Sequence, residues 1–355
     1  MAATKDDHRV DLVCEGGGMK GIGLAGAFST LEEQGWKAQN VAGTSAGAIT
    51  AAVIAAGYSA DELREITFGL DFHRFEDKSW QDRIPLVGKP LSVLIENGIY
   101  KGDEFLGWIR ELLEAKGIRT FADLRTDFDD PKYTSRLQVI ASDLTSRRLL
   151  VLPRDAAILG LEPDELEVAL AVRMSMSIPI FFKPVRITDK AGNDHVIVDG
   201  GILSNFPVWL FDCDDEEAPE WPTFGLLLVE PDPKKPIADR LPEPEHAPVG
   251  ARGLTQLCSG LFHTMVEAHD RLYIEKEQFA RTIPIPTLGV RTTEFDLVRK
   301  RAEELFDSGR TAAETFLATW DFGAYIAEFR SGKKQPTRRD EVVALYREKG
   351  PAAVV

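Results

Sequence analysis

Three glycine-rich stretches of the chain carry residue types suited to acyl transfer. They are Gly16-Gly17-Gly18-Met19-Lys20-Gly21, Gly43-Thr44-Ser45-Ala46-Gly47 and Asp199-Gly200-Gly201. In that order they offer backbone amides for a developing oxyanion, a hydroxyl nucleophile and a carboxylate base. An ester hydrolase needs all three components.

Ser45 stands in a Gly-x-Ser-x-Gly pattern, which forms a nucleophile elbow when it joins a strand to a helix. Glycine at positions 43 and 47 tolerates the crowding of such a tight turn. Residues 38–42 predict a short strand, and the small apolar residues 46–56 predict a helix that ends at Gly57. The amides at the start of this helix favour negative charge beside Ser45. A buried turn of small residues is the alternative.

The first glycine run predicts an oxyanion hole. Residues 9–14 predict a buried strand and residues 24–31 a helix, so the glycines form the loop between them. Consecutive glycines let the N–H groups of residues 16–19 converge on one anion. A nucleotide-binding loop is the alternative. A Walker loop needs Ser or Thr directly after its lysine, whereas Gly21 follows Lys20, but a dinucleotide-binding fingerprint is harder to exclude.

Asp199 follows the second of two predicted strands, at residues 183–187 and 195–198, which flank a turn at residues 189–194. Gly200 and Gly201 then turn the chain away. Strand ends of an α/β sheet are where catalytic groups collect. A lone Asp-Gly pair is usually only a turn. A catalytic role for Asp199 is therefore indicated only in combination with the other two motifs.

The order of these motifs resembles the patatin-like phospholipases, lipid acyl hydrolases that use a Ser-Asp dyad. Residues 173–184 (RMSMSIPIFFKP) and Asn205-Phe206-Pro207 resemble further blocks of that family, so the resemblance covers residues 9–210. One variable position is Lys20, where the family often has arginine. The motif positions that support the dyad and the oxyanion hole are Lys20, Gly21, Gly43, Gly47, Gly200 and Gly201.

The resemblance implies a phospholipase A or lysophospholipase type of hydrolysis through an acyl-enzyme on Ser45, with Asp199 as the base and no cofactor. The substrate is a lipid or another acyl ester. A carboxylate is a weak base toward a serine hydroxyl, so the dyad needs either a raised pKa at Asp199 or strong oxyanion stabilisation. We expect oxyanion stabilisation to dominate.

Two other functions stay open. A Ser-His-Asp esterase of the α/β-hydrolase type has the same residue order, with His246, His263 or His269 as its third member. A ligand-gated regulatory effector would keep the fold, and its C-terminal helices would bind a second copy of the chain or a small-molecule activator. No pair of histidines has metal-ligand spacing, so we expect no metal.

Composition predicts a globular α/β protein. The chain has 355 residues, 44% of them hydrophobic, which is enough for a substantial core. Apolar strands alternating with helices predict a three-layer α/β/α fold with a mostly parallel central sheet and extra C-terminal helices. We place the catalytic core at residues 1–230, a C-terminal helical extension packed on it at 231–330 and a partly mobile tail at 331–355. In the extension we expect a strand at 282–290 and helices at 294–307 and 311–329.

Charge and hydropathy bear on partners and location. The 42 Lys+Arg and 57 Asp+Glu give a net charge of −15, which disfavours nucleic acid and gives no general attraction to an anionic bilayer. Residues 72–94, where apolar and basic side chains alternate, are a candidate lid or membrane-facing rim, with a packed surface loop as the alternative. Without a membrane span or signal peptide, and with three scattered cysteines, the chain is expected in the cytoplasm, with peripheral access to the inner membrane surface.

Overall fold

The computed structural model describes residues 8–70, 100–128, 133–179, 181–212, 218–230, 276–292, 294 and 296–330. The candidate lid at residues 72–94 lies outside this part of the chain, as do His246, His263 and His269. Among the described helices, none has both the length and the apolar character needed to cross a bilayer.

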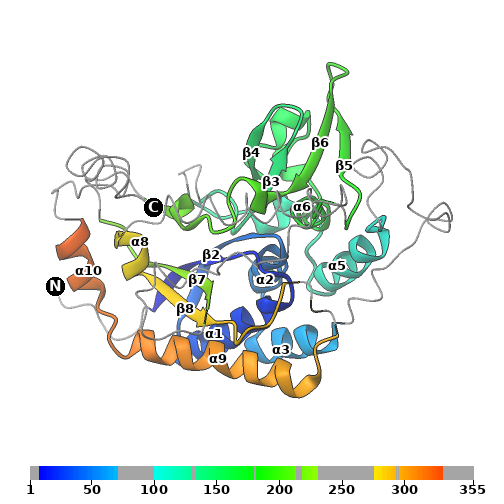
Figure 1. Cartoon of the computed structure of the whole chain (residues 1–355). Coiled ribbons are helices and arrows are strands. Elements are labelled where there is room, and N and C mark those ends of the chain that lie inside the picture. The colour runs from blue at the N-terminus through cyan, green and yellow to red at the C-terminus, as the bar shows by residue number, and fades with distance from the viewer. Residues whose placement is uncertain are drawn as a thin grey trace, which may run out of the picture.

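An eight-stranded sheet forms the centre of the protein, in the order β5-β6-β3-β2-β1-β7-β8 with β4 also paired to β3 (Figure 1). The strands are β1 (Arg9–Cys14), β2 (Lys37–Thr44), β3 (Leu137–Asp143), β4 (Arg148–Leu152), β5 (Val185–Thr188), β6 (Asp194–Asp199), β7 (Thr223–Val229) and β8 (Thr282–Pro286). Pairings among β1, β2, β3, β7 and β8 are parallel, whereas β4, β5 and β6 pair antiparallel. The predicted α/β fold with a central sheet is confirmed.

Helices and short apolar segments cover the two faces of this sheet. The helices are α1 (Ile22–Glu33), α2 (Ala46–Ala55), α3 (Ala60–Gly69), α5 (Asp103–Ala115), α6 (Val168–Ser175), α8 (Lys276–Ala280), α9 (Arg299–Leu317) and α10 (Phe322–Phe329). One face packs against α1, α2, α6 and α9, and residues 206–211 pack against the other. Side chains alternate accordingly: on β1, Leu12 and Cys14 face the helices, and Val13 faces the opposite side.

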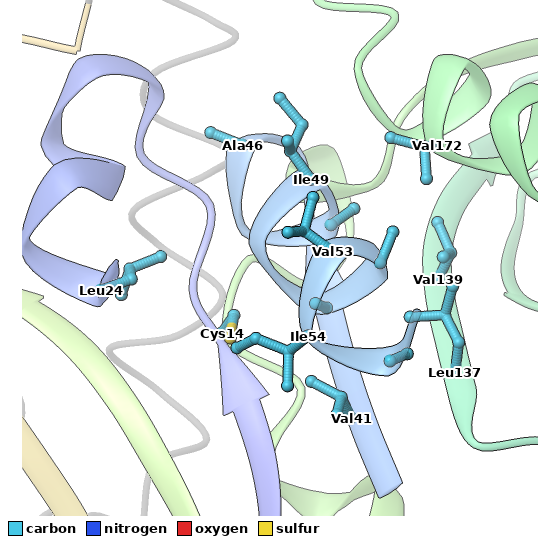
Figure 2. Close-up of a cluster of buried hydrophobic side chains, with 14 of the residues drawn as sticks. Cys14, Leu24, Val41, Ala46, Ile49, Val53, Ile54, Leu137, Val139 and Val172 are labelled. Atoms are coloured by element: carbon cyan, nitrogen blue, oxygen red, sulfur yellow. The ribbon is translucent and has the colours of Figure 1, made fainter. Parts of the chain in front are cut away.

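α2 is the most enclosed of the described helices that border the predicted motifs, because every one of its residues is buried. Its sequence is apolar on all sides, which is the pattern of a core helix. Figure 2 shows α2 between Cys14 of β1 and Val139 of β3, with Val172 of α6 close by. The start of α2, directly after Ser45, is therefore fixed by packing in several directions.

The helix prediction for the C-terminal region is partly wrong. Instead of a break between residues 307 and 311, α9 runs without interruption, and α10 follows. Gly309 lies inside α9 because α9 packs directly on α1: a Cβ at Gly309 would lie 2.0 Å from the carbonyl oxygen of Gly23. The predicted strand at 282–290 is β8, which ends at Pro286 and pairs with β7. The predicted domain boundaries at residues 230 and 330 stay predictions.

Candidate active site

Ser45 occupies the turn between β2 and α2, where the sequence places it. Its backbone has φ 53° and ψ −128°, a region that a non-glycine residue adopts at a cost of about 1–3 kcal/mol. The residue is 6% exposed. A strained strand-to-helix turn with a serine at its apex is the backbone geometry of a nucleophile elbow.

The two glycines around Ser45 allow this turn to pack. A Cβ at Gly43 would lie 2.3 Å from the carbonyl oxygen of Gly47. A Cβ at Gly47 would lie 2.3 Å from the carbonyl oxygen of Cys14, at the end of β1. Since both neighbours are backbone atoms in a close-packed interior, a side chain at either position would push the elbow out of place.

The register of β3 explains why Asp199 lies next to this elbow. β2 pairs with β3 as far as Thr44, opposite Ile140. β6 ends its pairing at Asp199, opposite the next residue of β3, Ala141. β4 pairs with residues 139–143 of β3, which overlap the β3 residues paired with β2 and with β6. β4 therefore lies along one edge of β3, and β2 and β6 lie one after the other along the opposite edge. Because β2 runs parallel to β3 and β6 runs antiparallel to it, their C-terminal ends converge, and Ser45 follows directly at that junction.

Asp199 is buried, with one carboxylate oxygen lacking a partner. Oδ1 accepts a hydrogen bond from the N–H of Gly201 at 2.8 Å, whereas Oδ2 has no hydrogen-bond partner among the described residues. Burial raises the pKa of Asp199 to about 7. The Gly201 amide limits the rise, as does the Ser45 hydroxyl, which lies near the carboxylate without making a hydrogen bond to it in this geometry. The carboxyl group therefore exchanges its proton near neutral pH, which suits a general base.

The glycine loop lies against the elbow, and its amides are not equivalent. A Cβ at Gly16 would lie 3.0 Å from the Cβ of Ser45. The N–H of Gly16 donates to the carbonyl of Asn205 at 3.1 Å, and the N–H of Met19 donates to the carbonyl of Thr292 at 3.1 Å. No described residue accepts a hydrogen bond from the N–H of Gly17 or of Gly18. Of the four amides predicted for an oxyanion hole, two therefore have acceptors and two have none among the described residues.

Other motif positions have packing roles in this loop. The N–H of Lys20 donates to the carbonyl of Gly17 at 3.1 Å, which closes a short 3-10 turn, and the residue is 8% exposed. Gly21 lies over the first turn of α2, since its Cβ would be 3.8 Å from that of Ala46. A Cβ at Gly200 would lie 2.3 Å from the carbonyl oxygen of Ile140, so this glycine lets the chain turn closely over β3.

Two residues in the blocks that resemble the family make contacts that the sequence did not predict. The hydroxyl of Ser175, at the end of α6, accepts the N–H of Ser45 at 2.9 Å. The side-chain amide of Asn205 donates to the carbonyl of Gly16 at 2.9 Å, and the main-chain carbonyl of Asn205 accepts the Gly16 N–H at 3.1 Å. A polar side chain inside an otherwise apolar block was the available signal, but the partner of each side chain depends on tertiary structure.

An apolar groove opens beside the glycine loop and the first turn of α2. Gly18, Met19 and Ala46 line it next to the proposed site. Its apolar walls come from α1, α2, α3 and α5 and consist of Ile22, Ile49, Leu63, Ile66, Leu70 and Trp108. With Thr50 and Thr67 as its polar side chains, the groove has the mostly apolar lining that is typical of sites for apolar ligands.

The two histidines in the described part of the chain do not complete a triad. His195 Nδ1 is 2.7 Å from Asp143 Oδ2, and this bond raises the pKa of His195. His8 stacks on Trp36 at the start of β2. Neither has a hydrogen bond to Ser45 or Asp199, so among described residues the carboxylate is the available base.

Comparison with known proteins identifies the family of the chain. The family model described as patatin-like phospholipase matches residues 12–212, more than half of the chain, and this region contains Ser45 and Asp199. The chain belongs to this family. It is therefore a patatin-like protein with an α/β fold built around a central sheet, and one of its relatives is named a probable lipid hydrolase.

Two proteins and one solved structure are similar to this patatin-like chain. It is 38% identical over 313 residues to the uncharacterized protein YqhO of Bacillus subtilis (strain 168). This alignment covers 88% of this chain and 99% of YqhO. It is 23% identical over 215 residues to the probable lipid hydrolase 463L of Invertebrate iridescent virus 6, covering 58% of this chain and 64% of that one. The crystal structure of VipD from Legionella pneumophila aligns with a TM-score of 0.49 and 17% identity, over 88% of this chain and 67% of that chain.

Proposed function

We propose that this patatin-like protein is a phospholipase A or lysophospholipase that cleaves carboxylic esters through an acyl-enzyme on Ser45. The observation that carries the proposal is a strained, buried serine beside Asp199, whose Oδ2 has no hydrogen-bond partner among the described residues. A serine hydroxyl becomes a nucleophile when an adjacent base accepts its proton. Asp199 supplies that base within the described part of the chain.

Acylation follows from the positions of these groups. Asp199 Oδ2 takes the proton of Ser45 Oγ, and Oγ attacks the carbonyl carbon of the ester. The N–H groups of Gly17 and Gly18 bind the resulting oxyanion, and each such donor contributes about 3–4 kcal/mol in comparable sites. When the tetrahedral intermediate collapses, the alcohol leaves with the proton held by Asp199. In the free protein Ser45 Oγ lies 3.7 Å from Met176 Sδ, so its hydroxyl rotates toward Asp199 before it reacts.

Deacylation repeats these steps with water. Asp199 accepts a proton from a water molecule, which attacks the acyl carbonyl on Ser45. The oxyanion returns to the same two amides, and collapse releases the carboxylic acid while Ser45 regains its proton. The pKa of about 7 lets Asp199 act as base in the first half of each step and as acid in the second at neutral pH.

The groove beside Ser45 supports a lipid as the acyl donor. It begins at Ala46, the residue after the nucleophile, and at Gly18 of the oxyanion loop. The acyl chain of a substrate bound with its carbonyl at these amides would run along Ile49 and Leu63. Burying a chain there gains about 0.8 kcal/mol for each methylene group, so long acyl chains are favoured over short ones.

The proposal is tested by measuring fatty acid released from phosphatidylcholine vesicles and from lysophosphatidylcholine micelles by mass spectrometry. Wild type is expected to release fatty acid from at least one of them, and the Ser45→Ala variant is expected to remain at the background rate. The ratio of the two rates distinguishes phospholipase A from lysophospholipase specificity. A His263→Ala/His269→Ala variant is the control and should keep wild-type activity. A silent wild type, or a Ser45→Ala variant with wild-type rates, would contradict the proposal.

A further inference from the structure

The backbone of Ser45 is held by a side chain from a distant segment. Ser45 is the N-cap of α2, and its strained φ of 53° turns its N–H away from the helix. That N–H donates to the hydroxyl of Ser175 at 2.9 Å. Ser175 is 0% exposed, so water cannot take its place. Without this hydroxyl the N–H would be a buried donor with no partner, which is unfavourable.

We propose that Ser175 is a positioning residue that holds the strained backbone of Ser45 and leaves the Ser45 hydroxyl available for reaction. This inference rests on the function proposed above. A serine at an N-cap normally uses its own hydroxyl to accept an N–H of the first helical turn. Ser45 makes no such bond to α2. Because Ser175 stabilises the turn from outside, the Ser45 hydroxyl is not committed to capping.

The segment that carries Ser175 is itself rigid. Arg173, 4% exposed, donates from Nη2 to the carbonyls of Lys101 and Lys183, each at 2.8 Å. Its Nη1 donates to the hydroxyl of Ser177 at 2.7 Å. The guanidinium therefore fixes the end of α6 to two other segments. A hydrogen bond to a fixed side chain restricts the position of the donor more than a hydrogen bond to a mobile side chain does.

The same segment also reaches the base. The carbonyl of Ser177 accepts the N–H of Asp199 at 3.0 Å. Residues 175–177 thus bind the backbones of both dyad members, one through a hydroxyl and the other through a carbonyl. Only the contact to Ser45 comes from a side chain, so substitution can remove it while the contact to Asp199 stays.

The test is steady-state kinetics of Ser175→Ala on a soluble short-chain p-nitrophenyl ester. We expect kcat to fall about 10–100-fold, because a shift of about 1 Å in a reacting group has an effect of this size. KM is expected to stay within about twofold of wild type, since the groove is untouched. The pH at half-maximal kcat/KM should not move, because Ser175 does not contact the carboxyl group of Asp199. A Ser175→Cys variant, nearly isosteric but a weaker acceptor, should fall between Ser175→Ala and wild type.

The matched control is Ser204→Ala. Ser204 is 2% exposed and its hydroxyl has no hydrogen-bond partner among the described residues, so this change deletes a buried hydroxyl that holds nothing. Its kcat should stay within about twofold of wild type. If Ser175→Ala does not fold, Ser175→Cys carries the comparison. The proposal is overturned if Ser175→Ala keeps wild-type kcat, if Ser204→Ala loses as much, or if the loss lies in KM. If Ser45→Ala is as active as wild type, the proposed function itself fails instead.

Discussion

Replacing Asp199 by asparagine is expected to lower kcat/KM for ester hydrolysis by about 10⁴-fold or more while the protein stays folded. An amide fills the same space, and its oxygen can still accept the N–H of Gly201, which now bonds Asp199 Oδ1 at 2.8 Å. It cannot accept the proton of Ser45, so the nucleophile is not activated. The measurement is hydrolysis of an acyl ester by freshly purified protein.

The same substitution is expected to change the pH dependence of stability. An unfolded aspartate loses its proton near pH 4, whereas burial raises the folded-state pKa of Asp199 to about 7. Between these values the folded state binds more protons, so wild-type stability falls as pH rises. The shift of about three units corresponds to as much as about 4 kcal/mol above pH 7. The unfolding free energy of Asp199→Asn, relative to wild type, should therefore increase by about 2–4 kcal/mol from pH 4 to pH 8.

A comparison with wild type and a second variant isolate the contribution of Asp199. His195, whose pKa is raised by its hydrogen bond with Asp143, is present in both proteins, so its contribution cancels in the difference. The new Asn-Gly sequence at residues 199 and 200 is prone to deamidation, which would restore an aspartate. An Asp199→Ala variant, which cannot revert, should be equally inactive. Substantial hydrolysis by Asp199→Ala, or no change in the stability difference with pH, would show that Asp199 is not a buried base.

A second large effect is expected from Gly47→Ala. The new Cβ would lie 2.3 Å from the carbonyl oxygen of Cys14 and 2.5 Å from that of Glu15. Both atoms belong to the backbone between β1 and the glycine loop, so α2 or the loop has to move. Overpacking of this kind costs about 1–3 kcal/mol, occasionally more. Displacement of the loop from Ser45 should also lower kcat by about 100-fold or more. Thermal unfolding and ester hydrolysis measure the two effects.

The control for this prediction is a glycine with free space around it. Gly107 lies inside α5, and a Cβ there would have no atom within 4 Å. Gly107→Ala should therefore keep full activity and stabilise the protein by about 1 kcal/mol, because alanine favours a helix. If Gly47→Ala behaves like Gly107→Ala, the close contact between α2 and the end of β1 is not required.

Local pattern was sufficient to predict the segments that carry the nucleophile and the glycine loop. Residues 9–14 form β1 as predicted, and the helix expected at 46–56 is α2. Both have a strong apolar pattern and end at glycines, so their bounds are visible in the sequence. The predicted break between helices at residues 307 and 311 is wrong, because Gly309 lies inside α9 and allows close packing on α1. In a sequence, a glycine that allows such packing looks the same as a glycine that ends a helix.

The meeting of Ser45 and Asp199 has a different origin. The order of motifs in a family suggested it, but its physical cause is that β2 and β6 end opposite adjacent residues on one edge of β3. Strand register between distant segments is not encoded in local periodicity. For the same reason the sequence could not predict which amides of the glycine loop donate hydrogen bonds to the main-chain carbonyls of Asn205 and Thr292.

The most direct test of the central claim is to identify the acylated residue. Wild-type protein is mixed with a long-chain p-nitrophenyl ester, quenched in acid within the first turnover and analysed by peptide mass spectrometry, in parallel with a fluorophosphonate probe. We expect an acyl or phosphonyl adduct on Ser45 that is absent from Ser45→Ala. An adduct on a different residue, or hydrolysis that continues in Ser45→Ala, would contradict it.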